Sequence, residues 1–496
     1  MKTCFVGIDV GSTSAKAAAF DASGSEIATV AAPNPRVAVA RDRQEIDMAA
    51  LWDVVCGVLR ELTDGLARDG WSIASLGCTG HGNGLYLVDE ELRPVRTAFA
   101  STDSRAEEIV GALEAVQVER TRSLTGSMPW AAQPAVLLRW LHEHEPETLQ
   151  RSYRALTCKD WLTTCLTGAP SADLSDSSGC GLVNLRTREY EPAVFEMLGL
   201  PADLMRLLPD LHDSDAIVGR VTAATAQLTG LPEDVPVVAG CMDCVASPLG
   251  AGAAELGDVT VIMGTWAINA VVVPADDEPP RVTINALLPN RDLMLAMEVA
   301  PTSAVSIEWA ARLLGARSER PLTPKDLLEA AQEIPPLADG LIFLPFIHGA
   351  PEHLGASGAL LGAMGSHGFP HVARAVAEGI TQYHRVQLEK VMASGAEVSD
   401  APWTLAGGGA KNPQWAQMFA DIVGHPIRRQ LGTELGARGV ASLAAAGIGV
   451  DMSAWKVVPD PELVVEPGPD RARYREQAER FDRIITSMSA VWEEYA

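Results

Sequence analysis

The first stretch whose residues could do chemistry runs from Phe5 to Asp21. Two apolar runs flank Gly11, Ser12, Thr13 and Ser14, a pattern that predicts a strand, a tight turn and a second strand. Turn amides and hydroxyls can donate hydrogen bonds to phosphate oxygens, and Lys16 adds a positive charge. Asp9 could hold Mg²⁺ through water, because this ion keeps most of its waters in proteins. An ordinary hairpin with a polar turn is the alternative.

A second candidate is the glycine-rich segment Gly407-Gly408-Gly409-Ala410, which follows a predicted strand over 403–406. Asn412 can cap the next helix, with Pro413 at its first position. A glycine-rich turn that opens a helix suits a ligand lying flat on the backbone, such as the adenine of a nucleotide. The alternative is a tight strand-to-helix turn.

Asp243 lies between a predicted strand over 235–239 and a run of small residues that extends to Gly252. A carboxylate at a helix N-terminus is held ionised by the macrodipole and can accept a proton from a substrate hydroxyl. The alternative is an aspartate that only caps the helix. Cys241 and Cys244 have metal-like spacing, but no second pair or histidine cluster accompanies them, which favours buried reduced thiols.

Two polar loops carry residues suited to a small hydroxylated molecule. His81, Gly82 and Asn83 lie between two further glycines, and Asp103 and Arg105 follow some twenty positions later. Aspartate and arginine side chains can bind hydroxyl groups. A solvated helix start is the alternative for the second loop.

The elements that must position these residues follow from hydrophobic periodicity. A third strand over 26–32, a helix capped by Asp47 and a strand over 73–78 follow the first hairpin, and 173–179 reads as a polar loop. Strands over 259–263 and 266–273 enclose Gly264 and Thr265, so the opening pattern recurs and predicts two related halves with a boundary near residue 250. Further helices are expected over 134–145, 158–167, 303–314, 324–332, 371–392, 432–447 and 471–494.

Composition limits the class of protein. The chain has 496 residues, enough for two to three domains, and a net charge of −25. Strong acidity argues against nucleic acid and anionic membranes as partners. No uncharged apolar run approaches the length of a membrane span, and no signal-peptide pattern is present, so a cytoplasmic location is expected.

The order of these segments resembles the FGGY family of carbohydrate kinases over nearly the whole chain. The resemblance implies an α/β fold of two ribonuclease-H/actin-like domains, each with a mixed β-sheet flanked by helices, and an active site in the cleft between them. It implies an N-terminal domain over 1–248, which holds the sugar site and the base, and a C-terminal domain over 249–496 for adenosine. It also implies ATP-binding roles for Gly11, Ser12, Thr13, Ser14, Lys16, Gly264, Thr265, Gly408, Gly409, Ala410 and Asn412.

The family chemistry implies transfer of the ATP γ-phosphoryl group to a sugar or polyol hydroxyl. Asp243 is then the general base and part of the substrate site, with His81, Gly82, Asn83, Asp103 and Arg105. Asp9 and Asp243 would hold Mg²⁺. The loop over 79–87 looks most like the L-xylulose kinase branch, with erythritol or another polyol and D-xylulose as alternative substrates.

A different class also remains open at this point, because an ATPase related to actin and Hsp70 shares the core fold. Such an ATPase would hydrolyse ATP without a sugar and would not need the loop over 80–84 or an acid at 243. The oligomeric state is left open, with a homodimer among the options.

Overall fold

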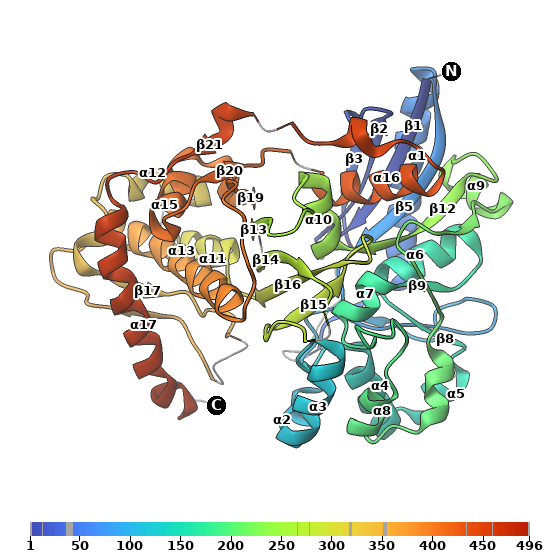
Figure 1. Cartoon of the computed structure of the whole chain (residues 1–496), viewed down its shortest axis with the longest axis horizontal. Coiled ribbons are helices and arrows are strands. Elements are labelled where there is room, and N and C mark those ends of the chain that lie inside the picture. The colour runs from blue at the N-terminus through green and yellow to red at the C-terminus, as the bar shows by residue number, and fades with distance from the viewer. Residues whose placement is uncertain are drawn as a thin grey trace. The chain divides into compact units, whose positions relative to one another are not determined.

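The computed structural model describes residues 2–11, 13–35, 43–264, 266–276, 278–316, 320–350, 355–432, 434–458 and 460–494. The chain forms two compact units (Figure 1). Unit 1 comprises Met1–Ala254, Val273–Ala296 and Glu434–Val457, and unit 2 comprises Glu255–Val272, Met297–Thr433 and Val458–Ala496. The functional division between 1–248 and 249–496 stays a prediction.

Unit 1 is built on a six-stranded mixed sheet in the order β11-β12-β5-β1-β2-β3. The predicted opening hairpin is confirmed, because β1 and β2 pair antiparallel. Strand β5 pairs parallel with β1, and β12 pairs parallel with β5. The strands are β1 (Lys2–Val10), β2 (Ser14–Asp21), β3 (Glu26–Pro33), β5 (Trp71–Gly80), β11 (Ile217–Arg220) and β12 (Pro236–Met242).

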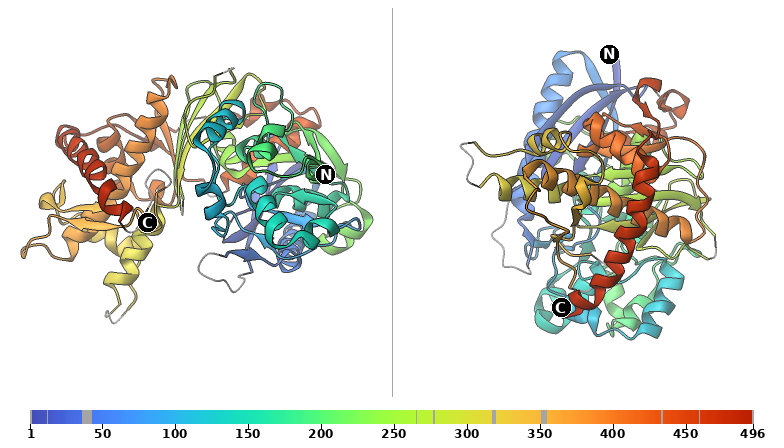
Figure 2. Two further views of the ribbon diagram at one scale, coloured as in Figure 1. Left: turned by 90° about the horizontal axis from the view of Figure 1, so that it is seen from below. Right: turned by 90° about the vertical axis from the view of Figure 1, so that its left-hand side faces the viewer.

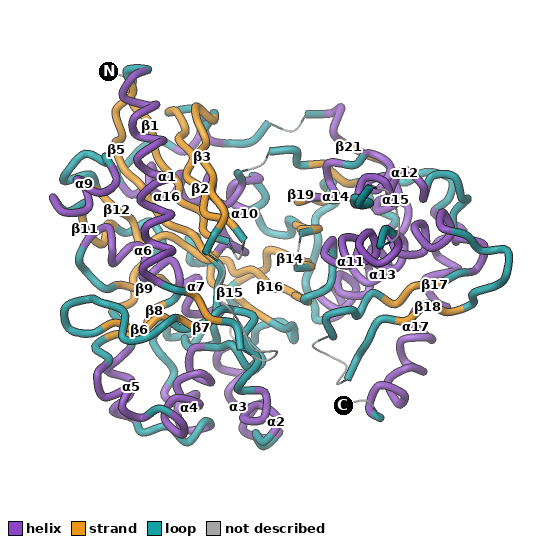
Figure 3. Tube along the Cα trace, turned by 180° about the vertical axis from the view of Figure 1, so that it is seen from behind, coloured by secondary structure: helices purple, strands orange, loops and turns teal. Residues whose placement is uncertain are grey.

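Alternation along β1 assigns its side chains to the two faces of this sheet. Cys4, Val6, Ile8 and Val10 pack with α1 (Met48–Arg68) and α6 (Cys158–Thr167). On the other face, Phe5 packs with α16 (Leu435–Gly447), which comes from near the end of the chain. Figure 1 shows orange α16 beside the blue strands, and Figure 3 shows α1 and α16 with the same sheet from behind.

The remaining elements of unit 1 include short strands and helices. The expected Asp47 cap is confirmed, since its carboxylate accepts from the Ala50 amide. The strands are β4 (Glu45–Ile46), β6 (Tyr86–Val88), β7 (Ala98–Phe99), β8 (Arg154–Leu156), β9 (Ser171–Asp173), β10 (Asp210–His212) and β15 (Ile284–Leu287). The helices are α2 (Glu107–Gly111), α3 (Ala115–Thr125), α4 (Pro134–His144), α5 (Pro146–Arg151), α7 (Leu174–Gly179), α8 (Pro192–Met197), α9 (Ala223–Thr229) and α10 (Asp243–Ala251).

Unit 2 repeats the layout of the opening hairpin. Strands β13 and β14 pair antiparallel, and β19 adds parallel to β13, as β5 adds to β1. The sheet continues through β20 to β21. The strands are β13 (Val259–Met263), β14 (Ala267–Pro274), β17 (Ile342–Leu344), β18 (Ala359–Leu361), β19 (Trp403–Gly407), β20 (Ile427–Arg429) and β21 (Val464–Val465), and β16 (Leu293–Ala300) runs across the unit boundary.

Helices flank this second sheet. In Figure 2 the C-terminal helix α17, coloured red, lies alongside the orange helices of the same unit. Arg385 on α13 joins it by an ion pair to Asp482 on α17. The helices are α11 (Ala304–Leu314), α12 (Pro324–Ala331), α13 (Phe369–Ala393), α14 (Gly408–Lys411), α15 (Pro413–Val423) and α17 (Arg471–Glu493).

Two features differ from the expectations. Residues 173–179 are not a loop: Asp173 caps the short helix α7, and the polar side chains of this helix are buried. The strands β15 and β16 were not expected at all. No helix among the described residues is long and apolar enough to cross a membrane.

Candidate active site

Three parallel strands of unit 1 end at the same level, and a chemically distinctive segment follows each. Val10 on β1, Gly80 on β5 and Met242 on β12 are neighbours in the sheet register. The turn over 11–14 follows β1, and the loop over 80–84, called the histidine loop below, follows β5. Helix α10, whose first residue is Asp243, follows β12. The carboxyl ends of parallel strands are where open α/β sheets bind ligands. The fold therefore gathers these three predicted segments at one edge.

Asp9 lies at this edge on the face covered by α16. A Cβ added to Gly436 would stand 2.5 Å from the Asp9 Oδ2, so the start of α16 packs directly against the carboxylate. Lys16 is the cross-strand partner of Asp9, and its Nζ lies 3.3 Å from Glu434 Oε2. Burial raises the pKa of Asp9 to about 7, with further increases from Asp243 and Glu434 and an opposing effect from Lys16.

The turn between β1 and β2 is fixed by its own backbone and by Asn34. Gly11 N–H donates to Ser14 O at 3.1 Å, and Asn34 Nδ2 donates to Gly11 O at 2.6 Å. A Cβ at Gly11 would meet only Ser14 O at 4.0 Å, so packing within the chain does not demand glycine there. Open space above a glycine suits the close approach of a ligand. Ser12 lies outside the described residues, and Thr13 and Ser14 lie on the turn.

Asp243 is half-buried at the start of α10. Burial raises its pKa to about 6, although the Cys244 thiol and the N–H groups of Cys244 and Gly82 donate to the carboxylate and oppose the shift. The Cys244 donor lies 2.7 Å from Asp243 Oδ1, so the capping-type contact of the alternative interpretation is also present. An aspartate that titrates near neutrality beside the histidine loop can take a proton from a bound hydroxyl.

The loop over 80–84 is enclosed. His81 and Asn83 are 7% and 4% exposed. Burial lowers the pKa of His81 to about 4, so the ring is neutral, and its Nε2 lies 3.1 Å from the Tyr86 hydroxyl. Asn83 adopts φ 61°, and its backbone N–H donates to Cys180 Sγ. Asn83 Oδ1 is buried without a hydrogen-bond partner among the described residues and can accept one, while its contact with a substrate stays a prediction.

Asp103 and Arg105 bind each other. The guanidinium forms two contacts of 2.8 Å with the Asp103 carboxylate, and Arg105 also reaches Glu45 Oε1 at 2.7 Å. It lies over the Phe99 ring at 4.4 Å. The segment borders the loop over 80–84, because Leu85 N–H donates to Phe99 O. A direct contact of Asp103 or Arg105 with a substrate stays a prediction.

Unit 2 carries the second pair of predicted segments at adjacent strand ends. Met263 and Gly407 are register partners on β13 and β19, so Gly264 and Gly408 begin their turns side by side. A Cβ at Gly409 would stand 2.7 Å from Met263 Sδ, whereas one at Gly408 would meet only Met263 O at 3.8 Å. Packing therefore explains Gly409 but not Gly408.

The ends of the glycine segment match the expectations for a helix start. Asn412 Oδ1 accepts from the Trp415 amide at 2.8 Å, which confirms the predicted cap on α15. Ala410 O accepts from Arg429 Nε at 2.8 Å. Thr265 lies outside the described residues. Roles of Gly264, Gly408, Gly409, Ala410 and Asn412 in nucleotide binding stay predictions.

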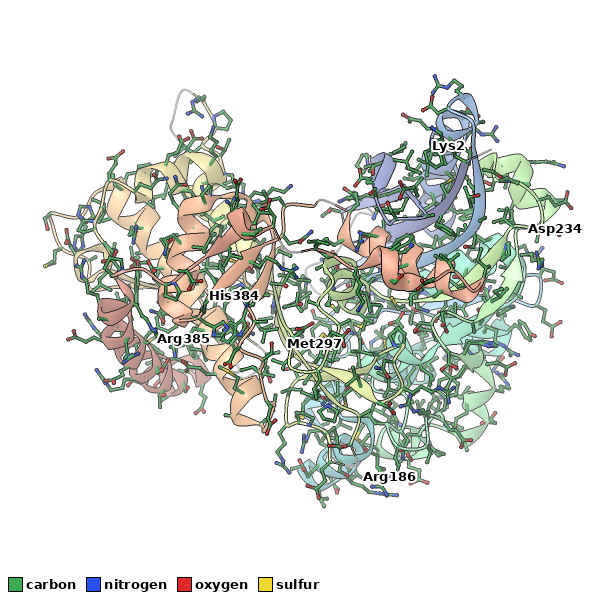
Figure 4. The ribbon with its side chains drawn as sticks, turned by 45° about the horizontal axis from the view of Figure 1, so that its top comes forward. Lys2, Arg186, Asp234, Met297, His384 and Arg385 are labelled. Carbon is green, nitrogen blue, oxygen red and sulfur yellow. The ribbon has the colours of Figure 1, made fainter. Side chains whose placement is uncertain are left out.

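A row of buried, hydrogen-bonded polar side chains supports the Gly264 turn, and the sequence did not predict it. Gly264 O accepts from the Ala304 amide, at the start of α11. The preceding Ser303 Oγ lies 2.9 Å from His384 Nε2, and His384 Nδ1 lies 2.8 Å from Asn269 Oδ1 on β14. Figure 4 labels His384, whose burial lowers its pKa to about 3 and keeps the ring neutral.

Two residues of unit 1 were also missed. Glu434 pairs with Lys16 across 418 positions of the sequence, and Asn34 reaches back 23 positions to the turn. Neither lies in a motif, and pairings of such sequence separation leave no periodic signal. The single hint in the sequence was Lys16, close to Asp9 at the end of a strand, because a lysine at such a place calls for a negatively charged partner.

Asp9 and Asp243 are carboxylates of the kind that would hold Mg²⁺, and their role as metal ligands stays a prediction. Mg²⁺ takes one or two carboxylates and completes its shell with waters and substrate phosphates. Among the described residues, no group of three or more His, Cys, Asp or Glu side chains is arranged to hold a metal ion by itself. The pKa of Asp9 is raised mainly by burial and further by the Asp243 and Glu434 carboxylates, and a bound cation would oppose both effects.

A kinase of small hydroxylated compounds requires a base, a loop that binds hydroxyl groups and turns that can approach a nucleotide. Asp243, the histidine loop and the glycine turns at the two sheet edges are candidates for these parts. Comparison with protein families agrees. Models of the N-terminal and C-terminal domains of the FGGY family of carbohydrate kinases match residues 4–250 and 259–448. The chain therefore belongs to the FGGY family and is an enzyme that phosphorylates sugars.

Individual relatives indicate which branch of the family the chain resembles. The L-xylulose/3-keto-L-gulonate kinase of Escherichia coli is 31% identical over 452 residues, 91% of this chain and 89% of that protein. The probable L-xylulose kinase of Pasteurella multocida is 28% identical and covers 98% of this chain and 99% of its own. The expected resemblance to the L-xylulose kinase branch is thus confirmed.

Solved structures confirm the fold. The crystal structure of a gluconate kinase from Lactobacillus acidophilus aligns with a TM-score of 0.88 at 21% identity, over 100% of both chains. The expected α/β architecture, two ribonuclease-H/actin-like domains with mixed sheets flanked by helices, is confirmed. At this identity the likeness shows the fold alone.

Proposed function

We propose that this kinase transfers the γ-phosphoryl group of ATP to a hydroxyl of a keto-pentose of the L-xylulose type, with Asp243 as the general base. The observation that carries the proposal is the half-buried Asp243 carboxylate, with a pKa of about 6, against the Gly82 amide of the histidine loop. The base and the hydroxyl-binding loop belong to one compact unit, so the acceptor hydroxyl and its proton acceptor are positioned together.

The residues divide the work as follows. Asp243 accepts the hydroxyl proton, and Asn83 Oδ1 accepts a hydrogen bond from a second hydroxyl and orients the sugar. Thr13, Ser14 and Lys16 hold phosphate oxygens, where the lysine contributes charge-assisted hydrogen bonds. Asp9 and Asp243 would hold Mg²⁺, which would neutralise charge on the β- and γ-phosphates. Catalysis is then mainly positioning and electrostatic stabilisation.

The charge balance near the histidine loop favours an uncharged sugar. Recognition of a sugar acid calls for a cation that can face a carboxylate. Arg105 is the basic residue of the bordering segment, and its guanidinium is already held by Asp103 and Glu45. Erythritol or another polyol and D-xylulose are the alternative substrates. A homodimer and a cytoplasmic location remain sequence-based predictions.

A substrate panel tests the proposal. ADP release is measured with Mg²⁺-ATP alone and with L-xylulose, D-xylulose, L-ribulose, erythritol, erythrulose and 3-keto-L-gulonate in turn. We expect the highest kcat/KM with L-xylulose and little ADP without a sugar. A clear preference for the sugar acid or a polyol would refute the substrate assignment. Full-rate ADP release without any sugar would favour the ATPase alternative.

The role of Asp243 is tested separately. Asp243→Asn keeps the shape of the side chain but cannot accept the proton, so we expect kcat to fall by about 10²- to 10⁴-fold, the usual contribution of a general base. ATP binding, measured by calorimetry, should survive. Asp47→Asn is the matched control, since asparagine also caps helices well. Near-normal turnover of Asp243→Asn would show that another group is the base.

A further inference from the structure

A fully buried charge cluster lies in unit 1 and has no part in the chemistry proposed above. Lys159 on α6 is 0% exposed, and its ammonium contacts Asp160, Asp173 at 2.7 Å and Asp176 at 4.0 Å. Burying four ionisable groups carries a large desolvation penalty, and replacing such groups by apolar residues is often neutral or stabilising. Fold stability alone therefore gives a weak reason for the cluster.

The cluster holds a proton as well as the lysine charge. Thr157 Oγ1 lies 2.8 Å from Asp160 Oδ2 and 2.7 Å from Asp176 Oδ2. One hydroxyl proton can be donated to only one of these carboxylates, so the other contact needs a protonated carboxyl that donates to the hydroxyl oxygen. Burial raises the pKa of both Asp160 and Asp176, so one of these two carboxyls carries this proton. Every member of the cluster is thereby satisfied, and its geometry is tightly defined.

One arm of the cluster leads to the base. Asp173 Oδ2 accepts from Ser175 Oγ at 2.6 Å and from Ser214 Oγ at 2.8 Å. Ser175 Oγ in turn accepts from the Met242 amide at 3.2 Å. Met242 is the last residue of β12, and Asp243 is the next along the chain. The hydroxyl of Ser175 therefore ties the backbone immediately before Asp243 to the buried ion pair.

A second arm leads to the histidine loop. Asp176 Oδ1 accepts from Cys180 Sγ at 3.5 Å, and Cys180 Sγ accepts from the Asn83 amide at 3.3 Å. Asn83 is held at φ 61°, a conformation that costs energy for a residue other than glycine and needs support from its surroundings. The two arms start from Asp173 and Asp176 of the same cluster. They end next to Asp243 and in the histidine loop.

We propose that Ser175 and Cys180 are positioning residues, which fix Asp243 and Asn83 relative to each other through the buried Lys159 cluster. The inference deepens the proposed function and rests on it. Displacing a reacting group by about 1 Å can cost on the order of 10²-fold in rate. Ser175 therefore governs mainly kcat, and Cys180 governs mainly KM for the sugar.

The chain offers a matched control for Ser175. Ser178 lies on the same helix α7 and is equally buried, and its Oγ accepts from a backbone amide at 2.9 Å, that of Leu287. Ser175→Ala and Ser178→Ala each remove one buried hydroxyl, leave one amide without its acceptor and remove one donated hydrogen bond, which runs from Ser175 to Asp173 Oδ2 and from Ser178 to the Ser175 carbonyl. The two variants should lose similar stability, but only the first frees the backbone next to Asp243.

Kinetics of the two serine variants is the first test. We expect Ser175→Ala to lower kcat by about 10- to 100-fold with KM for the sugar near the wild-type value, because a misplaced base affects the transition state more than binding. Ser178→Ala should keep kcat near wild type. Equal kcat in the two variants overturns the proposal for Ser175. If Ser175→Ala does not fold, Ser175→Cys, which keeps the shape and weakens the acceptor, should still fall below Ser178→Ala.

Cys180→Ala tests the second arm, with Cys56→Ala on α1 as control. Losing one hydrogen bond should raise KM for the sugar by about fivefold and change kcat little. An unchanged KM overturns the proposal for Cys180.

Amide hydrogen exchange separates this proposal from the proposed function, since it needs no substrate. Ser175→Ala should speed exchange in the peptide that contains Met242, and Ser178→Ala should instead speed it in the peptide that contains Leu287. Cys180→Ala should do so at Asn83. If the wild-type enzyme phosphorylates none of the sugars but these exchange patterns appear, the function is wrong and the positioning geometry stands. Unchanged exchange at Met242 and Asn83 overturns the positioning.

Discussion

Replacing Asp243 by asparagine should make the protein more stable as well as inactive. Burial raises the pKa of this carboxyl from 3.8 to about 6, so the ionised form is less favourable in the folded state than in the unfolded chain. At neutral pH the folded protein therefore carries the cost of a charge that catalysis needs. Asparagine keeps an oxygen to accept from the Gly82 and Cys244 amides but carries no charge.

The size of the effect follows from the shift. About two pKa units at about 1.4 kcal/mol each give an upper bound of about 3 kcal/mol. Asp243 is half-buried, and solvent screening reduces this to about 1–2 kcal/mol. For a folding unit of this size, each kcal/mol moves Tm by about 2–4 °C, so Asp243→Asn should raise Tm by about 2–8 °C at pH 7.5.

The stability of the protein should also depend on pH through Asp243. A carboxyl with a raised folded pKa keeps its proton in the folded state while the unfolded chain has lost it, so this group's contribution to stability falls as pH rises from about 4 to 6. Thermal unfolding across this range should show a decline in the wild type that is shallower in Asp243→Asn. Asp47→Asn is the control and should change neither Tm nor the slope. An Asp243→Asn variant no more stable than the wild type at pH 7.5 would refute the reasoning.

Three further results are expected. Gly408→Ala should fold with an unchanged Tm and raise KM for ATP about tenfold, because the added methyl enters open space that we assign to the nucleotide. Gly409→Ala should instead lower Tm through its clash with Met263, and equal ATP affinity of Gly408→Ala and wild type would contradict the assignment. At acid pH, kcat/KM should fall with an apparent pKa of about 6 to 7, because protonated Asp243 cannot accept the hydroxyl proton. A flat profile down to pH 5 would exclude Asp243 as the base. Lys16→Met should weaken ATP binding at least about tenfold in calorimetry, and unaltered binding would remove Lys16 from the phosphate site.

Local patterns made much of the fold predictable. The opening hairpin and the one over 259–273 follow from apolar runs broken by small polar turns, and both are present. The cap at Asn412 followed from the residue type beside Pro413. These signals act over a few residues, so the sequence alone carries them.

Features set by distant partners were not predictable. The segment 173–179 looked like a loop because serine and aspartate usually face water. It forms a buried helix because Lys159, Thr157 and Ser214 satisfy its polar groups. Glu434 was missed for the same reason, since nothing near it in the sequence shows that it faces Lys16.

The origin of α16 has a consequence for the synthesis of the protein on the ribosome. One face of the N-terminal sheet, with Phe5 and Phe20, is covered by Ala437, Ala441 and Trp455. More than 400 residues must be translated before that cover exists, which at about 5–20 residues per second takes roughly 20–90 s. During this interval Phe5 and Phe20 of the nascent sheet are exposed to solvent or to chaperones. Premature termination before residue 434 would therefore leave an aggregation-prone chain, even though that chain would contain the histidine loop and Asp243.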